Sequence, residues 1–194
     1  MENCLLGIDM TVNVIYDNRS FDKKELLLKE FSNQGIIDYK FWDCVVITND
    51  VVSSINASHK MVVRYAKENG LKQVCIAEDD LMFPCIGAWD YFLNNKPDDF
   101  DLYLSATYVV SHPLKHICGF HLYVVNESFY DKFLSVPDDA HIDTVMDNVK
   151  GNFVFCYPFA ALQRPGFSAN NKSVVNYNSV LDPKHIYNAN AHNI

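Results

Sequence analysis

The chain has 194 residues, of which 49% are hydrophobic and 21% are charged, and its formal net charge is −8. This length is enough for one domain with a sizeable core, and the composition is ordinary for a globular enzyme. The acidic balance, without any stripe of basic residues, argues against a nucleic-acid partner. An acidic protein that binds a diphosphate has to supply positive charge locally, through a metal ion or a few Lys and Arg side chains.

The N-terminus has no basic region followed by a long apolar run, so we expect no signal peptide. No stretch approaches the roughly 20 apolar residues that a membrane span needs, so we expect no integral membrane segment. The six cysteines form no CxxC pair, which is typical of buried thiols in a reducing compartment. These features predict a cytoplasmic protein, whose association with any membrane would be peripheral.

The first half of the chain alternates between strand-like and helix-like segments. Strands are rich in aromatic and β-branched residues, and the helical segments carry apolar residues at helical spacing and end at Gly35 and Gly70. Such alternation predicts an α/β fold with a mostly parallel sheet flanked by helices. The expected strands are 12–16, 39–46 and 73–77, and the expected helices are 21–33 and 55–69.

The second half is more mixed. After Pro158 it becomes rich in Asn and Ser, which predicts loops and an extended tail over 181–194. No linker or repeat divides the chain, so we expect a single domain over 1–194 in which 169–194 is a loop or tail. The expected helices are 88–94, 127–136 and 142–149, and the expected strands are 101–109, 120–125 and 152–157.

Three consecutive acids, Glu78-Asp79-Asp80, lie between two apolar stretches, 74–77 and 81–83. Unpaired charge is costly in such a position, which suggests a buried strand that delivers carboxylates into a cleft at its C-terminal end. Side chains alternate in an extended segment, so Glu78 and Asp80 should point the same way and Asp79 the other. Oxygen ligands gathered in this manner suit Mg²⁺ or Mn²⁺, and we assign Glu78 and Asp80 to a metal.

Two other interpretations of the acids stay open. The acids could begin a helix and complement its dipole. They could also belong to a phosphohydrolase on an α/β sheet, in which Asp17 at the end of the first strand would be the nucleophile. No clear Lys, Ser or Thr partners follow at the expected strand ends, so this second interpretation is the weaker one.

An ordered set of motifs resembles glycosyltransferase family 25, which contains lipopolysaccharide-biosynthesis glycosyltransferases and collagen galactosyltransferases. The resemblance covers about 12–168. It departs from the family at His141, where members tend to have Pro, and at Phe120 and His121, where members have small residues. The chain is also shorter than typical members. The motifs are Asn18-Arg19 after the first strand, Ser58-His59 on a helix, Glu78-Asp79-Asp80, Gly119 to Tyr123, His141-Ile142-Asp143, Tyr157-Pro158, Gln163 and Ser168.

The resemblance implies a GT-A fold, a nucleoside-diphosphate sugar donor that is usually UDP-linked, a divalent metal and inversion at the anomeric carbon. It also implies that Ser58 and His59 shape the donor pocket. The helical face that His59 shares with Ile55 and Val63 equally suits a hydrogen-bonded core histidine. Asp79 would contact ribose or the sugar, or cap the following turn.

Sugar transfer also needs a general base for the acceptor hydroxyl. Asp143 is our candidate, because it matches the downstream Asp of the family and opens an apolar helical stretch; a helix N-terminal acid is the plain alternative. His141 and His121 are alternates. His121 stands beside Gly119, where backbone can approach a ligand closely, although a lone strand histidine is more often structural.

Two loops complete the expected donor site. Asn18 and Arg19 follow the first strand and should lie at the same sheet edge as the acids. They would hold the nucleobase or ribose there, unless they only form a turn. Gln163, Arg164 and Ser168 surround a Pro-Gly turn that would make a mobile lid, with Arg164 as counter-charge to the diphosphate. An ordinary surface turn is the alternative.

The sequence therefore predicts a metal-dependent glycosyltransferase that uses Mn²⁺ or Mg²⁺ and acts on a glycan or glycolipid hydroxyl. A degenerate domain that binds nucleotide sugar or glycan without turnover is the competing hypothesis, because the chain is short and is altered near Gly119. Exposed Tyr and Phe residues in the second half are compatible with a homodimer.

Overall fold

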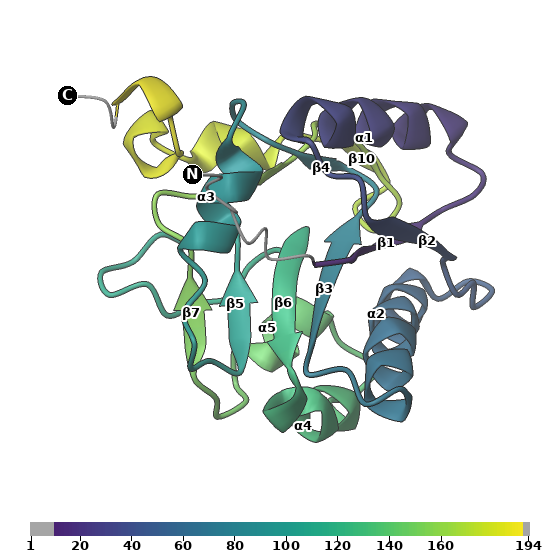
Figure 1. The fold of residues 1–194 in the computed structure, drawn as a ribbon. Coiled ribbons are helices and arrows are strands. Elements are labelled where there is room, and N and C mark those ends of the chain that lie inside the picture. The colour runs from purple at the N-terminus through teal and green to yellow at the C-terminus, as the bar shows by residue number, and fades with distance from the viewer. Residues whose placement is uncertain (1–9, 192–194) are drawn as a thin grey trace.

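The protein is described by a computed structural model that covers residues 10–191. Its central sheet consists of β1 (Val12–Tyr16), β2 (Tyr39–Asp43), β3 (Gln73–Glu78), β5 (Leu102–Leu104), β6 (Leu122–Asn126) and β7 (Phe153–Phe155). The spatial order is β2-β1-β3-β6-β5-β7, and β6 alone of these six runs antiparallel to its neighbours (Figure 1). The predicted fold class, an α/β fold with a mostly parallel central sheet flanked by helices, is confirmed.

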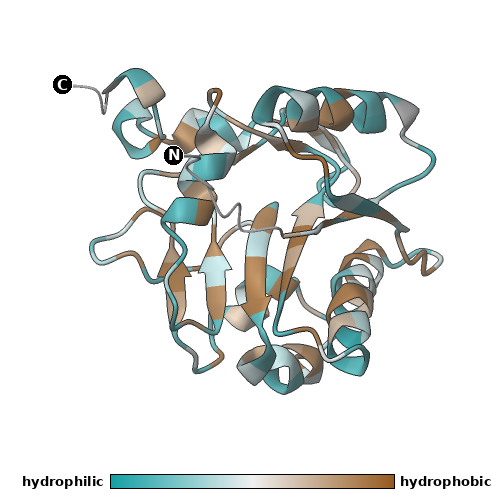
Figure 2. Cartoon of the chain, viewed as in Figure 1, coloured by the Kyte–Doolittle hydropathy of each residue, from teal (hydrophilic) through white to brown (hydrophobic). Residues whose placement is uncertain are grey.

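Helices cover both faces of this sheet (Figure 1). Alternation along β3 divides its apolar side chains between two cores. Figure 2 shows the hydrophobic residues along the central strands. Cys75 and Ala77 pack with α1 and α3, whereas Val74 and Ile76 pack with α2, α4 and α5. The helices are α1 (Phe21–Gln34), α2 (Val51–Glu68), α3 (Ala88–Asn94), α4 (Tyr130–Ser135), which follows the 3₁₀ turn η1 (Glu127–Phe129), and α5 (Ile142–Met146).

Helix α2 begins four residues before the predicted start at position 55. Its N-cap is Asp50, whose carboxylate accepts a hydrogen bond from the Ser53 amide at 2.9 Å. This cap satisfies one of the free amides of the first turn and lets Val and Ser residues begin the helix despite their modest helix propensity. The capping aspartate was the signal that the periodicity alone did not reveal.

The second half departs further from the prediction. The strand expected over 101–109 is only β5, because the chain leaves the sheet at Ser105. The region after Pro158 contains short strands in place of uninterrupted loops. These are β8 (Leu162–Gln163), which pairs with β4 (Leu81–Met82), and the hairpin β9 (Gly166–Ser168) and β10 (Ser173–Val175).

The predicted tail over 181–194 lies partly outside the described residues. The chain before its described end forms 3₁₀ turns, and it packs against the rest of the domain, since Leu181 and His185 are buried. Long-range pairing that no local pattern encodes therefore organises this region. The turns are η2 (Tyr177–Val180), η3 (Pro183–His185) and η4 (Ala189–Ala191).

No helix within residues 10–191 has the length and apolar character to cross a membrane. The cysteines described in the structure are free thiols, and Cys75 and Cys156 are buried. The predicted burial is confirmed for these two cysteines, whereas Cys44, Cys85 and Cys118 are only partly buried.

Candidate functional site

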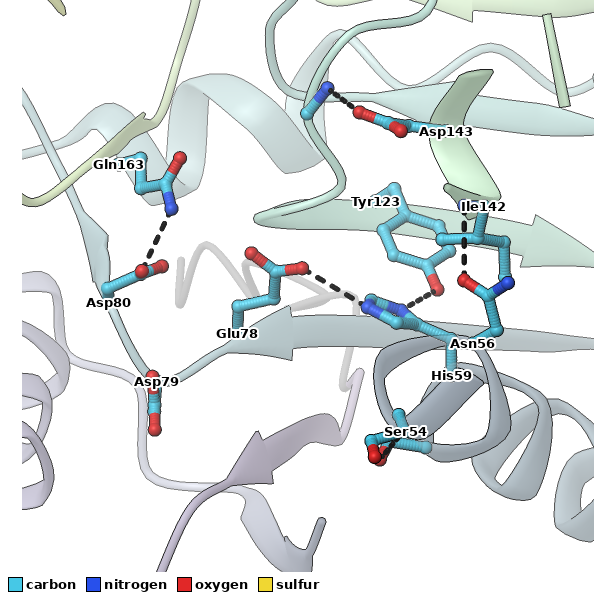
Figure 3. A network of polar contacts seen from close by, with 12 residues as sticks. Ser54, Asn56, His59, Glu78, Asp79, Asp80, Tyr123, Ile142, Asp143 and Gln163 are labelled. Atoms are coloured by element: carbon cyan, nitrogen blue, oxygen red, sulfur yellow. Dashed lines mark hydrogen bonds and ion pairs between the residues drawn. The ribbon is translucent and has the colours of Figure 1, made fainter. Parts of the chain in front are cut away.

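The three acids lie where β3 leaves the sheet. Glu78 is the last residue of β3, and Asp79 and Asp80 form the turn that leads into β4. Figure 3 shows Glu78 and Asp80 on one side of this backbone and Asp79 on the other, as the predicted alternation requires. The strand end therefore presents two carboxylates together and directs the third elsewhere.

Glu78 is held by a buried histidine of α2. The Oε1 atom of Glu78 lies 3.1 Å from Nε2 of His59, and Nδ1 of His59 lies 2.7 Å from the hydroxyl of Tyr123 on β6 (Figure 3). Burial raises the pKa of Glu78, but the hydrogen bond and positive field of His59 outweigh it, so the pKa falls below its usual value. Glu78 is thus kept ionised, in one orientation.

Asp80 is the least compensated carboxylate of the site. Its Oδ2 accepts a hydrogen bond from the side-chain amide of Gln163 at 2.9 Å, while its buried Oδ1 has no partner among the described residues. Burial, reinforced by the negative charge of Glu78, raises the pKa of Asp80 to about 7. An orphaned buried carboxylate oxygen beside a second carboxylate is a position that favours a cation.

Asp79 points toward α1, where Lys23 binds it. The Lys23 ammonium lies 2.7 Å from Asp79 Oδ1 and 3.9 Å from Asp80 Oδ2, and the Asp17 amide donates to Asp79 Oδ2 at 3.1 Å. Burial opposes the charge of Lys23, but the acids outweigh it and raise its pKa. Sequence reasoning missed Lys23. It could have been found from its place in the first turn of α1, the helix that follows β1, at the same sheet edge as the acids.

The positive side chains around the acids are already paired. Arg19 forms an ion pair with Asp17 at 2.7 Å, and Arg164 forms one with Glu30 at 2.6 Å. Lys23 is bound closely to Asp79 and reaches Asp80 only at 3.9 Å, so among the described residues no Lys or Arg donates a hydrogen bond to Glu78 or Asp80. The predicted counter-charge role of Arg164 would require it to leave Glu30.

The residues fit a divalent cation bound by Glu78 and Asp80. Within residues 10–191, no group of three or more His, Cys, Asp and Glu side chains could hold a metal ion. Mg²⁺ sites can use one or two carboxylates and take their remaining oxygens from water and substrate phosphates. The chemistry of the two carboxylates and the orphaned Oδ1 atom of Asp80 are consistent with that arrangement.

A cavity of about 200 Å³ adjoins Glu78. Gln163 and Tyr108 line it near the acids, and His141 and Asp143 line it from the start of α5. Ser168 on β9 lines it as well, so the hairpin contributes to the wall. The cavity brings predicted metal, base and donor residues to one place although they are up to 90 positions apart in the sequence.

Asp143 is fixed by backbone amides. Its Oδ2 accepts from the Gly119 amide at 3.0 Å (Figure 3). Its Oδ1 accepts from the Thr144 amide at 2.8 Å. The segment before it is tied to α2 by the fully buried Asn56, which binds the Ala140 carbonyl and the Ile142 amide. A carboxylate oxygen has room for a second hydrogen bond, so Asp143 can still meet a hydroxyl in the cavity.

His121 is buried next to Gly119, which lines the cavity. Its Nε2 lies 3.2 Å from the Ala161 carbonyl oxygen, and its Nδ1 has no partner among the described residues. Burial lowers the pKa of His121, although the negative charge of Glu78 opposes this effect. The lowered pKa favours the neutral ring at pH 7. His141, the other alternate, is an exposed cavity residue at the N-terminus of α5.

The remaining predicted residues separate into two groups. Ser58 has a structural role: its hydroxyl accepts from the Val45 amide at 2.8 Å and fixes the loop after β2. Asn18 and Arg19 are exposed in the loop after β1, whose first residue, Asp17, contacts Asp79. They lie at the edge of the sheet that carries the acids but do not line the cavity.

No protein-family model matches the sequence, and no curated protein matches it. Among solved structures, a glycosyltransferase involved in glycosylation of the major capsid of PBCV-1 is 11% identical, with a TM-score of 0.46 over 75% of this chain and 80% of its own. The galactosyltransferase LgtC, in complex with donor and acceptor sugar analogs, is 8% identical, with a TM-score of 0.45 over 75% of this chain and 73% of its own.

The catalytic domain of Drosophila beta1,4-galactosyltransferase 7 with xylobiose is 11% identical, with a TM-score of 0.44 over 76% of this chain and 64% of its own. A mutant of that enzyme was solved with manganese, UDP-Gal and xylobiose. Likenesses this distant do not define the reaction of this chain, so its function is inferred below from the residues of the site.

Proposed function

We propose that the protein is a metal-dependent glycosyltransferase. It would move a sugar from a nucleoside-diphosphate sugar, UDP-linked, to a hydroxyl of a glycan or glycolipid, with inversion at the anomeric carbon. The observation that carries this proposal is the pair Glu78 and Asp80, two carboxylates at the end of β3, of which Asp80 has an orphaned oxygen and Glu78 lines a cavity. Mn²⁺ or Mg²⁺ is the cofactor we infer.

A cation bound by Glu78 and Asp80 would neutralise negative charge on a departing diphosphate. The chain's own residues prepare this site. His59 orients Glu78, and the Gln163 amide orients Asp80. Lys23, which is partly exposed and already lies between Asp79 and Asp80, is placed to donate a charge-assisted hydrogen bond to a phosphate oxygen.

On the acceptor side, we assign the general base to Asp143. Its position on the cavity wall, fixed by the Gly119 and Thr144 amides, supports this role because a base must be held within hydrogen-bond reach of the hydroxyl. We assign Ser168 to the sugar in the same cavity. Asn18 and Arg19, at the edge beyond the acids, would contact the nucleobase or the ribose of the donor.

We also propose that the chain acts as a single glycosyltransferase domain. The late segments are needed for the site, because Gln163 binds Asp80 and Tyr177 lines the cavity. A domain boundary before residue 160 would separate these groups from β3.

The test is thermal melting with UDP, GDP, CMP and their sugars, each with Mn²⁺ and with EDTA, because a ligand that binds only the folded state raises the melting temperature. We expect a shift for UDP ligands with Mn²⁺ that disappears with EDTA and in Asp80→Asn. The matched control is Asp131→Asn, an exposed carboxylate on α4, which should retain the shift. No shift with any nucleotide would reject the proposal.

Turnover separates the enzyme from its competing hypothesis. Release of UDP from a UDP-sugar, dependent on Mn²⁺ or Mg²⁺, supports the transferase. Binding of UDP-sugars without release of UDP, with a panel of glycan acceptors present, would instead support a domain that binds without turnover.

A further inference from the structure

The buried side chain of His121 carries an unpaired nitrogen. His121 is 1% exposed and stands just before β6, where its Nε2 lies 3.2 Å from the carbonyl oxygen of Ala161. A carbonyl oxygen can only accept a hydrogen bond, so Nε2 carries the hydrogen. A buried imidazole with one neutral partner is neutral, which leaves a lone pair on Nδ1. Nδ1 is therefore a hydrogen-bond acceptor without a donor among the described residues.

This lone pair lies under Gly119. A Cβ atom placed on Gly119 would stand 3.2 Å from Nδ1 of His121 and 3.2 Å from the Tyr108 ring. Gly119 has φ +103°, a backbone conformation that side chains rarely adopt, so the position stays free of a side chain. Gly119, Tyr108 and Glu78 all line the cavity. Nδ1 of His121 thus lies close to the Gly119 wall of the cavity, and a hydroxyl in the cavity would reach it after a small shift of the Gly119 backbone.

An acceptor buried without a donor is costly, and such groups in native proteins call for an explanation. The other groups near Gly119 do not supply the donor. The hydroxyl of Tyr108 accepts from the backbone amide of Gln163 at 2.7 Å and lies 3.1 Å from Asn178 Oδ1. The backbone amide of Gly119 donates to Asp143. The missing donor is therefore expected from a ligand.

We propose that Nδ1 of His121 accepts a hydrogen bond from a hydroxyl group of the sugar that binds in this cavity. The inference rests on the proposed function and adds a residue that selects the sugar. Asp143 is bound to the amide of Gly119, so Asp143 and His121 would flank the same glycine. They would bind neighbouring hydroxyl groups of one sugar ring. An acceptor-only group discriminates against sugars that are deoxygenated or methylated at the contacted hydroxyl.

Two substitutions separate the two nitrogens. In His121→Gln, the side-chain amide can still donate to Ala161, but no acceptor remains at the place of Nδ1. In His121→Asn, an amide oxygen can occupy the place of Nδ1, and the bond to Ala161 is lost. A purely structural histidine would tolerate Gln better than Asn, whereas a hydroxyl-binding histidine would tolerate Asn better than Gln.

The affinities of UDP, UDP-glucose, UDP-galactose and UDP-N-acetylglucosamine are measured with Mn²⁺ for both variants. UDP should bind all proteins alike, which tests the proposed function separately. The sugar-dependent gain in affinity should fall about tenfold or more in His121→Gln and stay within about threefold in His121→Asn, the range expected for one hydrogen bond. Equal gains in both variants, or a larger loss in His121→Asn, would overturn the inference.

The imidazole nitrogens give a second measurement on the unaltered protein. In ¹⁵N spectra, the Nδ1 resonance of His121 should report an unprotonated nitrogen that shifts when a sugar-bearing ligand is added and does not shift with UDP. Methyl glucoside and methyl galactoside are added in the same series, so that a sugar is tested even if UDP does not bind. An Nδ1 signal that no sugar moves would overturn the inference, including where a resident water already occupies the acceptor.

Discussion

His59 connects Glu78 at the site to Tyr123 in the core: its Nε2 lies 3.1 Å from the Glu78 carboxylate and its Nδ1 lies 2.7 Å from the Tyr123 hydroxyl. Because a carboxylate only accepts, Nε2 carries the hydrogen of that bond, and Nδ1 makes the second bond to the tyrosine hydroxyl. The second oxygen of Glu78 then points to the Asp80 side of the site (Figure 3). A hydrogen-bonded chain from β6 thus sets the direction of a carboxylate on β3.

Tyr123→Phe tests this chain. It removes the hydroxyl and leaves Nδ1 of His59 buried without a hydrogen-bond partner, which should lower the free energy of unfolding by about 1–3 kcal/mol. Freed from its orientation, Glu78 should bind Mn²⁺ about tenfold more weakly, the lower range for loss of a supporting bond to a metal ligand. Urea unfolding and a Mn²⁺ titration measure the two effects.

The matched control is Tyr130→Phe. That hydroxyl lies 3.1 Å from the Leu71 carbonyl oxygen on the α4 side of the molecule, away from the acids, so its loss should leave Mn²⁺ affinity unchanged. Equal Mn²⁺ affinities in wild type and Tyr123→Phe would show that Glu78 does not depend on this chain.

Asp80 should destabilise the metal-free protein at neutral pH. Its pKa rises from 3.8 to about 7 on folding, so the unfolded chain ionises it more readily. The penalty is absent below pH 3.8, grows as the pH rises from about 4 to 7, and is constant above. At one pKa unit per 1.36 kcal/mol, its upper bound is about 4 kcal/mol.

Asp80→Asn should therefore stabilise the protein in EDTA at pH 8 by more than at pH 4.5. Urea unfolding of both proteins at the two pH values gives the comparison. With Mn²⁺ present at pH 8, the order should reverse, because only the wild type gains stability from the cation. A stability difference that does not change with pH would contradict the raised pKa.

The sequence predicted the acids well because two local rules agreed. A strand that ends in carboxylates and the two-residue alternation placed Glu78 and Asp80 together without any tertiary information. Gln163 was named from a family motif, but its contact with Asp80 depends on the pairing of β4 with β8, which spans about 80 positions and leaves no periodic signal. Short strands after Pro158 were missed for the same reason.

Side chains that hold other residues were the hardest to predict. Asn56 looks like an ordinary polar helix residue, yet it is fully buried and binds the backbone before Asp143. Its role depends on α2 and α5 packing against each other, a relation set by the two-sided core. Ser58 was expected in the donor pocket through the family resemblance, whereas the structure shows it bound to the loop after β2.

Lys23→Met should change the affinities for the metal and for the nucleotide in opposite directions. Removing a positive charge beside Asp79 and Asp80 should increase the affinity for Mg²⁺. Loss of a charge-assisted hydrogen bond should weaken UDP binding at saturating Mg²⁺ by about tenfold or more. Titration calorimetry with Mg²⁺ alone, and then with UDP, separates the two affinities.

The control is Lys29→Met, which removes the same charge from an exposed position on the same helix. It should leave both affinities near those of the wild type. If Lys23→Met also leaves UDP affinity unchanged, Lys23 serves only to neutralise Asp79.

Asp143→Asn should lower turnover and spare binding. The amide can still accept one backbone hydrogen bond, so the start of α5 is retained, but it cannot take a proton from an acceptor hydroxyl. The kcat for sugar transfer should fall about 10²–10⁴-fold, the usual effect of a general base, while UDP affinity in the presence of Mn²⁺ changes little. Steady-state transfer assays and UDP titrations measure these quantities.

Asp147→Asn is the matched control for that variant. Asp147 also fixes the loop before Gly119, through the Ile117 amide at 2.8 Å and His116 at 3.0 Å, but it does not line the cavity. A carboxylate that only supports this loop should produce the same modest loss of stability in both variants without the large fall in kcat. If Asp143→Asn and Asp147→Asn lose turnover equally, Asp143 only holds the loop. The general base then has to be sought among Glu78 and His141, which line the cavity, and the buried His121.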